Sequence, residues 1–244
     1  MSDRLALQKT VAPPSKVAPL RFYLDSADTE AHRKWLPTGL FYGITCNPLL
    51  LEKANVPCTT SQLIELADRA CALGCQEVHL QSWGHRLADL IATGRTLGKS
   101  NPRVVVKLPA TQTGSAAART LIQEGIPITL TAVYAVHQVL IAAALGADYA
   151  APYLGRINDS GKEGRAEVTN MHKALRSINS PTRLLTASIR ALDDITALAA
   201  QGADTFTFSE TIAEAFFNHP DTERATADFE RAAEKMGGIR REQV

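Results

Sequence analysis

Short apolar runs alternate along the chain with stretches in which apolar residues recur at helical spacing, and this alternation predicts the fold. The runs predicted as strands are Arg21–Leu24, Leu40–Thr45, Glu77–Gln81, Arg103–Lys107, Pro127–Thr131, Tyr149–Tyr153, Arg183–Ser188 and Asp204–Phe208. Helical spacing is clearest in Ser61–Leu73 and Val133–Leu145, and glycines such as Gly125 and Gly146 follow helices where C-terminal caps are expected. Eight strand–helix repeats predict an α/β protein with one parallel sheet, closed into a single (β/α)8 TIM barrel.

The N-terminal residues do not share this alternation. Residues 1–20 carry Pro13, Pro14 and Pro19 among small and basic residues, with no apolar period. We therefore expect a flexible N-terminal arm over residues 1–20 and one barrel domain over residues 21–244. A subunit contact is the alternative role for the arm.

The C-terminal segment predicts an additional helix over Asp221–Lys235. Ala225, Phe229, Ala232 and Met236 fall on one apolar stripe of this segment. Such a stripe packs either on its own barrel or on a neighbouring subunit.

Length, charge and cysteine content narrow the functional classes. A chain of 244 residues suits one barrel domain, and a net charge of +1 without a basic tail predicts neither a nucleic-acid nor a membrane partner. No apolar run approaches 18 residues, so no transmembrane helix is expected. The four cysteines show no metal-ligand spacing with His, which predicts free thiols in a reducing, cytoplasmic location and no zinc site.

One lysine stands directly after a buried strand. Val104–Val106 is a β-branched run, Lys107 follows it, and Pro109 cannot donate to a sheet ladder. Desolvation disfavours the charged form of a buried lysine and lowers its pKa, which makes a neutral amine available as a Schiff-base nucleophile. The alternative is a lysine at a strand end whose ammonium group reaches solvent.

Polar residues also follow the other strands, at the barrel face where TIM-barrel active sites lie. The set is Asp25, Thr45 with Asn47, Gln81, Lys107, Thr131, Tyr153 with Arg156, and Ser188 with Arg190. It holds one amine, one carboxylate, neutral hydrogen-bonding groups and two guanidinium groups, without a His or Cys cluster. This combination favours imine chemistry on a polyhydroxylated carbonyl compound with an anionic tail.

Six short motifs in fixed order resemble the transaldolase family, and within it the small fructose-6-phosphate aldolase-like members. The motifs are Phe22–Asp28 (FYLDSAD), Gly43–Pro48 (GITCNP), Val105–Thr111 (VVKLPAT), Thr131–Tyr134 (TAVY), Ala151–Ile157 (APYLGRI) and Leu185–Arg190 (LTASIR). The similarity runs from about residue 21 to the last helix. Each motif alone is weakly specific, but six in order are strongly specific.

The resemblance implies a Schiff-base (class I) aldolase or transaldolase that needs no metal and no cofactor. It implies catalytic roles for Lys107 as the imine-forming residue, Asp25 in proton transfer, and Gln81, Thr131 and Tyr153 around a catalytic water. It implies that Thr45 and Asn47 bind the dihydroxyacetone part, and that Arg156, Ser188 and Arg190 hold a phosphate. The implied ligand is a small-molecule sugar phosphate.

Structural roles compete with these assignments. Asp25 is also a candidate helix cap, and Asn47 before Pro48 is also typical of a turn. Gln81 and Thr131 are candidates for structural hydrogen bonds. Arg156 and Arg190 are candidates for surface ion pairs, with the assignment of Arg190 the more open of the two.

The choice between aldolase and transaldolase depends on a few positions. In this family a tyrosine at the position of Tyr153 and a glutamine at that of Gln81 accompany aldolase activity, because a phenol hydroxyl relays protons and a phenyl ring does not. Gly155 is closer to small transaldolases. Cys46 replaces a usual threonine, and Trp83 stands where a smaller residue is expected, near the predicted pocket mouth.

The favoured reaction is cleavage or formation of the C3–C4 bond of fructose 6-phosphate, giving dihydroxyacetone and glyceraldehyde 3-phosphate. Transaldolase transfer of the dihydroxyacetone unit between sugar phosphates is the first alternative. A catalytically silent, sugar-phosphate-binding barrel is the second. The resemblance also implies a homo-oligomer, up to a decamer, in which the C-terminal helix packs on a neighbour.

Overall fold

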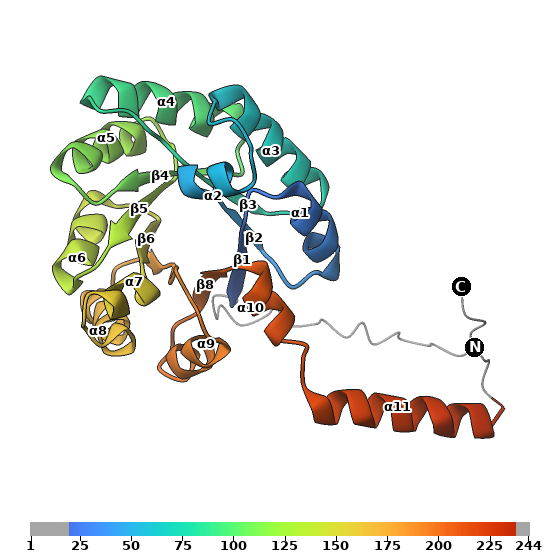
Figure 1. The fold of residues 1–244 in the computed structure, drawn as a ribbon. Coiled ribbons are helices and arrows are strands. Elements are labelled where there is room, and N and C mark those ends of the chain that lie inside the picture. Colours follow the sequence, from blue (N-terminus) through green and yellow to red (C-terminus); the bar gives the residue numbers. More distant parts are fainter. Residues whose placement is uncertain (1–19, 238–244) are drawn as a thin grey trace, which may run out of the picture.

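Eight parallel strands form a ring in the computed structural model, which describes residues 20–237 (Figure 1). The strands are β1 Arg21–Asp25, β2 Gly43–Thr45, β3 Glu77–Gln81, β4 Val104–Pro109, β5 Ile128–Val133, β6 Tyr149–Pro152, β7 Arg183–Leu184 and β8 Thr205–Phe208. Their order is β7-β6-β5-β4-β3-β2-β1-β8. The last gap is bridged beyond β7, where the N–H of Thr186 donates to the carbonyl of Thr205 at 3.0 Å and its carbonyl accepts from Thr207 at 2.9 Å. The predicted TIM barrel is confirmed.

Helices surround this ring and follow the strands in turn (Figure 1). They are α1 Thr29–Trp35, η1 Leu36–Thr38, α2 Pro48–Lys53, α3 Thr60–Ala72, α4 Leu87–Ser100, α5 Gln112–Gln123, α6 Val136–Leu145, α7 Leu154–Asp159, α8 Gly164–Ser177, α9 Leu192–Ala199, α10 Glu210–Ala215 and α11 Pro220–Lys235. Asn47, Thr59 and Thr111 accept hydrogen bonds from the first turns of α2, α3 and α5. Capping side chains therefore stabilise the starts of these three helices.

The segment between β6 and β7 contains two helices, α7 and α8, where the sequence predicts one helix near residues 167–179. Gly155 and Gly164 lie in these helices, and glycine weakens a helical signal. Close packing requires the second of them, because a Cβ at Gly164 would lie 2.7 Å from Asn158 Oδ1 and 2.8 Å from the Leu154 carbonyl. The glycine that the packing requires is therefore also the residue that weakens the helical pattern in the sequence.

The alternating faces of β4 explain the position of its lysine. Val104, Val106 and Leu108 belong to the apolar core between the strands and the surrounding helices. Val105 belongs instead to a small cluster inside the ring, and Lys107 has the same parity as Val105. Since strand side chains alternate between faces, Lys107 projects into the barrel.

The C-terminal helix α11 extends away from the barrel (Figure 1). It has no buried residue, and Phe229 and Met236 are 71% and 87% exposed. The apolar stripe predicted for this segment therefore has no packing partner within residues 20–237. Of the expected arm over residues 1–20, all but Leu20 lies outside the described residues.

Two further findings concern thiols and membranes. Cys46, Cys58, Cys71 and Cys75 are free thiols in the structure. Across residues 20–237, no helix has both the length and the apolar character that crossing a lipid bilayer requires.

Candidate active site

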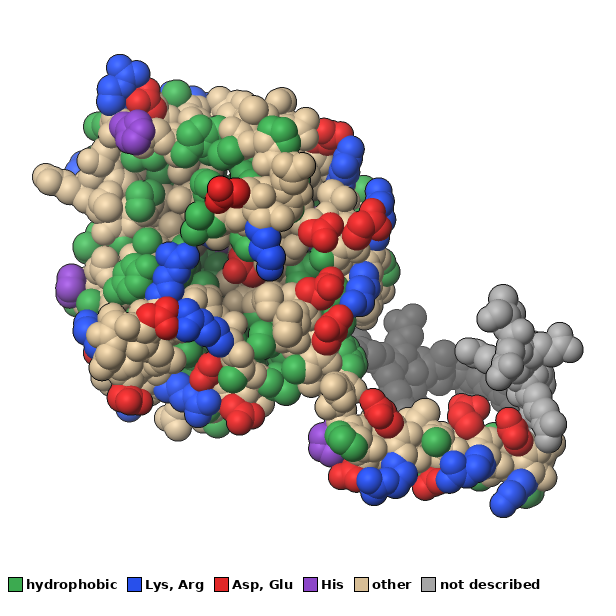
Figure 2. Space-filling view, viewed as in Figure 1, with side chains coloured by type: hydrophobic (Ala, Val, Ile, Leu, Met, Phe, Trp, Pro, Cys, Tyr) green, Lys and Arg blue, Asp and Glu red, His purple; other side chains and the backbone are tan. Residues whose placement is uncertain are grey.

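A cavity of about 250 Å³ lies at the C-terminal ends of the strands. Figure 2 shows a hollow on this face, bordered by basic and acidic side chains. The lining residues are Asp25, Asn47, Leu49, Leu50, Lys53, Lys107, Tyr153, Arg156, Ala187 and Ser188. Six of the ten residues proposed from the sequence therefore line one cavity.

Two lysines line this cavity, Lys53 and Lys107. Of the two, only Lys107 is buried, with 3% of the residue exposed. Within residues 20–237 it forms no hydrogen bond or ion pair with another side chain. Its neighbour Cys46 is a poor competitor as a nucleophile, because burial raises the pKa of that thiol to about 12. The cavity therefore offers one buried, unengaged amine at its inner end.

Asp25 is held by the Thr45 hydroxyl and does not cap a helix. Thr45 Oγ1 donates to Asp25 Oδ1 at 2.6 Å and lies 2.6 Å from Thr207 Oγ1. The cap of α1 is Asp28, whose Oδ1 accepts from the Glu30 N–H at 2.9 Å. Asp25 is therefore free of the capping role and faces the cavity, while Thr45 supports it from below.

Tyr153 and Thr131 form a hydroxyl pair beside the lysine. Tyr153 Oη lies 2.8 Å from Thr131 Oγ1, and the Tyr134 ring packs against the Tyr153 ring at 5.8 Å between centroids. Gln81 is half-buried and is the register partner of Lys107 on the neighbouring strand, although it does not line the cavity. A phenol, a hydroxyl and an amide can together hold a water close to the amine.

Asn47 caps a helix and also lines the cavity. Its Oδ1 accepts from the N–H groups of Leu49 and Leu50 at 3.0 and 3.1 Å, which caps α2. The cap fixes the side chain, and the Nδ2 donors have no protein partner in the described part of the chain. Since Asn47 lines the cavity, this amide can donate to a ligand hydroxyl or carbonyl.

Arg156 forms the basic edge of the cavity. It is exposed, its guanidinium carbon lies 5.1 Å from the centroid of the Tyr153 ring, and it forms no direct ion pair within residues 20–237. Its helix α7 is tied to the segment that follows the neighbouring strand β7, since the Gly155 N–H donates to the Ser188 carbonyl at 2.9 Å. Ser188 has a φ of +57°, a conformation that costs a non-glycine residue about 1–2 kcal/mol.

Arg190 is turned away from the cavity in this structure. Its Nη1 and Nη2 each donate to one carboxylate oxygen of Asp159 at 2.6 Å. Gly155 explains how closely this side chain approaches α7, because a Cβ there would lie 2.7 Å from Arg190 Nε and 2.5 Å from the Ser188 carbonyl. Because Gly155 has no side chain, the Arg190 side chain can pack against α7. Arg190 is not among the residues that line the cavity.

Two polar residues near the site were not predicted. Lys53 lines the cavity from α2, and it forms no ion pair within the described residues. It follows Leu49 by four positions, and residues four apart share a helix face, so the helical period alone indicates Lys53. His79 lies two residues before Gln81 on β3 and is wholly buried inside the ring. Because side chains two apart on a strand share a face, the position of Gln81 also indicates that of His79.

Trp83 and the histidines take no part in the cavity. Trp83 is partly buried against the outer core and is not among the residues that line the cavity, although the sequence places it near the pocket mouth. In residues 20–237, no group of three His, Cys, Asp or Glu residues is arranged to hold a metal ion.

Comparisons with known proteins identify one family. The family model described as Transaldolase/Fructose-6-phosphate aldolase matches residues 22–243. A probable transaldolase of Aquifex aeolicus is 33% identical, over 88% of this chain and 99% of the relative. Probable transaldolases of Listeria monocytogenes and Methanococcus maripaludis are each 30% identical, over 86% of this chain and 94% and 95% of the relatives.

Proposed function

Because the chain belongs to the transaldolase/fructose-6-phosphate aldolase family, we propose that it is a class I aldolase acting on fructose 6-phosphate. The reaction is reversible cleavage of the C3–C4 bond, giving dihydroxyacetone and glyceraldehyde 3-phosphate. The observation that carries the proposal is the buried, unengaged amine of Lys107 in a cavity that also holds Asp25 and Arg156. No cofactor or metal is needed for this chemistry.

The proposed reaction begins with attack of the neutral Lys107 amine on the C2 carbonyl of the ketose. Loss of water gives an iminium ion, which accepts the electron pair of the C3–C4 bond as that bond breaks. The C4 hydroxyl loses its proton to a base, and the C4–C6 fragment leaves as the aldehyde. Asp25 lies in the cavity with its carboxylate held by Thr45, which supports its role in this proton transfer.

The remaining enamine decides between the two family activities. An aldolase protonates the enamine at C3, and water then releases dihydroxyacetone from Lys107. The pairing of the Tyr153 and Thr131 hydroxyls supports a proton relay at this step, with Gln81 on the neighbouring strand. A transaldolase instead holds the enamine for an acceptor aldose phosphate.

A specific observation favours the transaldolase alternative. The close approach of Arg190 to α7 depends on Gly155, the position at which the chain resembles small transaldolases. The named relatives are also called probable transaldolases. We nevertheless favour the aldolase, because Tyr153 and Gln81 both carry the groups that release of dihydroxyacetone requires.

Product release with and without an acceptor tests this proposal. Purified protein is incubated with fructose 6-phosphate, and glyceraldehyde 3-phosphate is followed with and without erythrose 4-phosphate. Sustained turnover without acceptor is the expected result. Turnover only with acceptor, with sedoheptulose 7-phosphate as product, would establish the transaldolase instead. Inactivity under both conditions, with unmodified Lys107, would favour a silent sugar-phosphate-binding barrel.

Arg156 is proposed to hold the phosphate with Ser188, and Lys53 adds a second cation at the same cavity. Arg156→Gln is expected to raise KM for glyceraldehyde 3-phosphate about tenfold, since hydrogen bonds to charged groups contribute about 1.5–3 kcal/mol. KM for unphosphorylated glyceraldehyde should not change. Lys53→Gln should act in the same direction with a smaller effect.

The control for both variants is Arg69→Gln, which removes an exposed arginine paired with the exposed Glu65 on α3. Steady-state synthesis with dihydroxyacetone as donor measures the KM values. An equal loss with both aldehydes would contradict a phosphate-binding role for Arg156.

The proposed partner of α11 is a second copy of the chain, in a homo-oligomer of up to ten subunits. The support is the exposed stripe around Phe229, which packs nowhere on the described barrel. Phe229→Asp is expected to lower the mass measured by light scattering to that of smaller species. Ala227→Asp, which adds the same charge on the opposite face of α11, is the control and should leave the mass unchanged.

A wild-type mass already equal to that of one chain would contradict this assembly.

The four free thiols are consistent with a reducing compartment, and we propose the cytoplasm as the location. The proposed substrate class also places the enzyme in pentose phosphate metabolism.

A further inference from the structure

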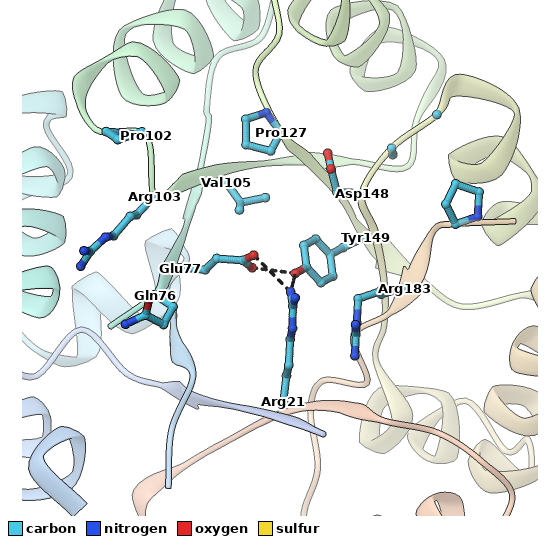
Figure 3. A pocket seen from close by; sticks show the side chains of 13 residues that line it. Arg21, Gln76, Glu77, Pro102, Arg103, Val105, Pro127, Asp148, Tyr149 and Arg183 are labelled. Atoms are coloured by element: carbon cyan, nitrogen blue, oxygen red, sulfur yellow. Dashed lines mark hydrogen bonds and ion pairs between the residues drawn. The ribbon is translucent and has the colours of Figure 1, made fainter. Parts of the chain in front are cut away.

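The two mouths of the barrel hold their side chains in different ways. A cavity of about 410 Å³ lies at the N-terminal ends of the strands, where Glu77 Oε1 accepts from Arg21 Nη1 at 3.2 Å and Glu77 Oε2 accepts from Tyr149 Oη at 2.6 Å (Figure 3). Arg183 of the same lining pairs with Asp204 at 3.2 Å. Charged groups therefore fix the side chains at this mouth, whereas those at the C-terminal mouth also depend on an unusual backbone conformation.

Four residues other than glycine adopt a left-handed backbone conformation within residues 20–237, namely Asn55, Ala132, Asn179 and Ser188. Asn55 and Asn179 lie just beyond the ends of α2 and α8, where asparagine commonly adopts this conformation. Ala132 and Ser188, with φ of +58° and +57°, have no such preference. Both lie beside the segment that carries Tyr153, and residues in sparsely populated backbone regions cluster at functional sites.

Ala132 belongs to a β-bulge in β5. Leu130 pairs with Ala150 and Val133 pairs with Pro152, so β5 advances three residues while β6 advances two. Pro152 has no N–H to donate, and a proline inside a sheet is typical of a bulge. Leu130 and Val133 both belong to the outer core, although regular alternation would place residues three apart on opposite faces. The left-handed Ala132 therefore absorbs the extra residue.

Three contacts from this bulge fix Tyr153. Thr131 is buried, and its Oγ1 lies 2.8 Å from Tyr153 Oη. The Val133 carbonyl accepts from the Tyr153 N–H at 3.1 Å, and the Tyr134 ring packs against the Tyr153 ring at 5.8 Å between centroids. These contacts come from both sides of Ala132 along the chain, so a different backbone conformation at that residue would break their alignment.

We infer that Ala132 is a positioning residue of the reaction, whose left-handed conformation aims the Thr131 hydroxyl and the Tyr153 phenol at each other. The inference rests on the proposed function, in which this hydroxyl pair relays the proton to the enamine. Ala132 has only a methyl side chain, so it acts through the backbone and supplies no catalytic group itself.

The first test compares two larger residues at this position. Ala132→Val adds a β-branched side chain, which tolerates the left-handed conformation poorly, whereas Ala132→Asn adds a side chain that is compatible with it. Ala132→Val is expected to lower acceptor-free cleavage of fructose 6-phosphate about tenfold or more, and transfer to erythrose 4-phosphate less. Ala132→Asn should lose much less of the acceptor-free activity. Equal losses in the two variants would overturn the inference, because added bulk would then explain both.

A double-mutant cycle with Tyr153→Phe shows whether Ala132 acts through the phenol. The relay is already absent in Tyr153→Phe, so adding Ala132→Val should lower acceptor-free cleavage by no more than about twofold. A further loss as large as in the wild-type background would contradict the inference alone. Wild-type protein without acceptor-free turnover would instead contradict the proposed function, and with it the relay that Ala132 positions.

Melting temperatures test the left-handed conformation independently of the reaction, and also if Ala132→Val does not fold. Ala132→Gly should keep or raise Tm, because glycine adopts this conformation without steric cost. The matched control is Ala116→Gly, at an exposed position inside α5, which should lower Tm because glycine weakens a helix interior. A similar fall of Tm in both variants would contradict a left-handed Ala132 and overturn the inference.

Discussion

Replacement of Lys107 by methionine is expected to reduce fructose 6-phosphate cleavage by about 10⁴-fold or more. The variant keeps a side chain of similar length and removes only the amine, which is the imine-forming group of the proposed reaction. A loss of this size corresponds to about 5 kcal/mol of transition-state stabilisation. Initial rates of glyceraldehyde 3-phosphate release measure it.

The same variant should fold at least as well as the wild type. Lys107 is 3% exposed, and burying an ammonium group costs free energy that a thioether does not. The melting temperature is therefore expected to stay the same or rise, which separates loss of chemistry from loss of structure. Lys99→Arg, on the outer surface beside Glu124, is the matched control and should keep full activity. Activity above about one hundredth of wild type in Lys107→Met would mean that another group forms the adduct.

Replacement of Tyr153 by phenylalanine is expected to separate the two family activities. Removing the hydroxyl that pairs with Thr131 takes away the proposed proton relay, and general acid–base catalysis typically contributes about 10²- to 10⁴-fold. Cleavage without an acceptor should therefore fall about 100-fold. Transfer to erythrose 4-phosphate should fall much less, because in that reaction the enamine carbon attacks the acceptor aldehyde instead of taking up a proton.

Tyr134→Phe is the control for this experiment. The Tyr134 ring packs against the Tyr153 ring, so the control tests the loss of a nearby phenol hydroxyl without removing the proposed relay. An equal fall of both activities in Tyr153→Phe would assign Tyr153 to substrate positioning and remove the argument for an aldolase.

The barrel was predictable because each strand and most helices carry their own local signal. Val104–Val106 shows a buried strand, and Gly146 ends α6 in the left-handed conformation that glycine favours. The position of Lys107 followed from the same logic, since strand ends of a parallel barrel meet at one face. Asp25, Asn47, Tyr153, Arg156 and Ser188 line the cavity for that reason.

The features that the sequence did not predict depend on contacts between distant segments. The pairing of Arg190 with Asp159 joins the loop after β7 to α7, and no local pattern records it. Trp83 turns to the outer core instead of the pocket, because burial against the helices competes with exposure at the mouth. The short helix α7 was missed because Gly155 serves a close approach and lowers the helical signal.

The apolar stripe of α11 shows the opposite case, in which a correct local signal does not identify the partner. The period of Ala225, Phe229 and Ala232 predicts an amphipathic helix, and the helix is present. The pattern alone is the same whether the stripe packs on its own barrel or on another subunit. The structure narrows this choice, since the described barrel leaves the stripe exposed (Figure 1).

The most direct test of the account is to trap the covalent intermediate and locate it. The protein is incubated with fructose 6-phosphate, reduced with borohydride, and analysed by intact mass and peptide mapping. The account predicts one three-carbon adduct per chain, on the peptide that contains Lys107. Lys53 is the other lysine that lines the cavity, so an adduct there, or an unmodified chain, would contradict a Schiff-base reaction at Lys107.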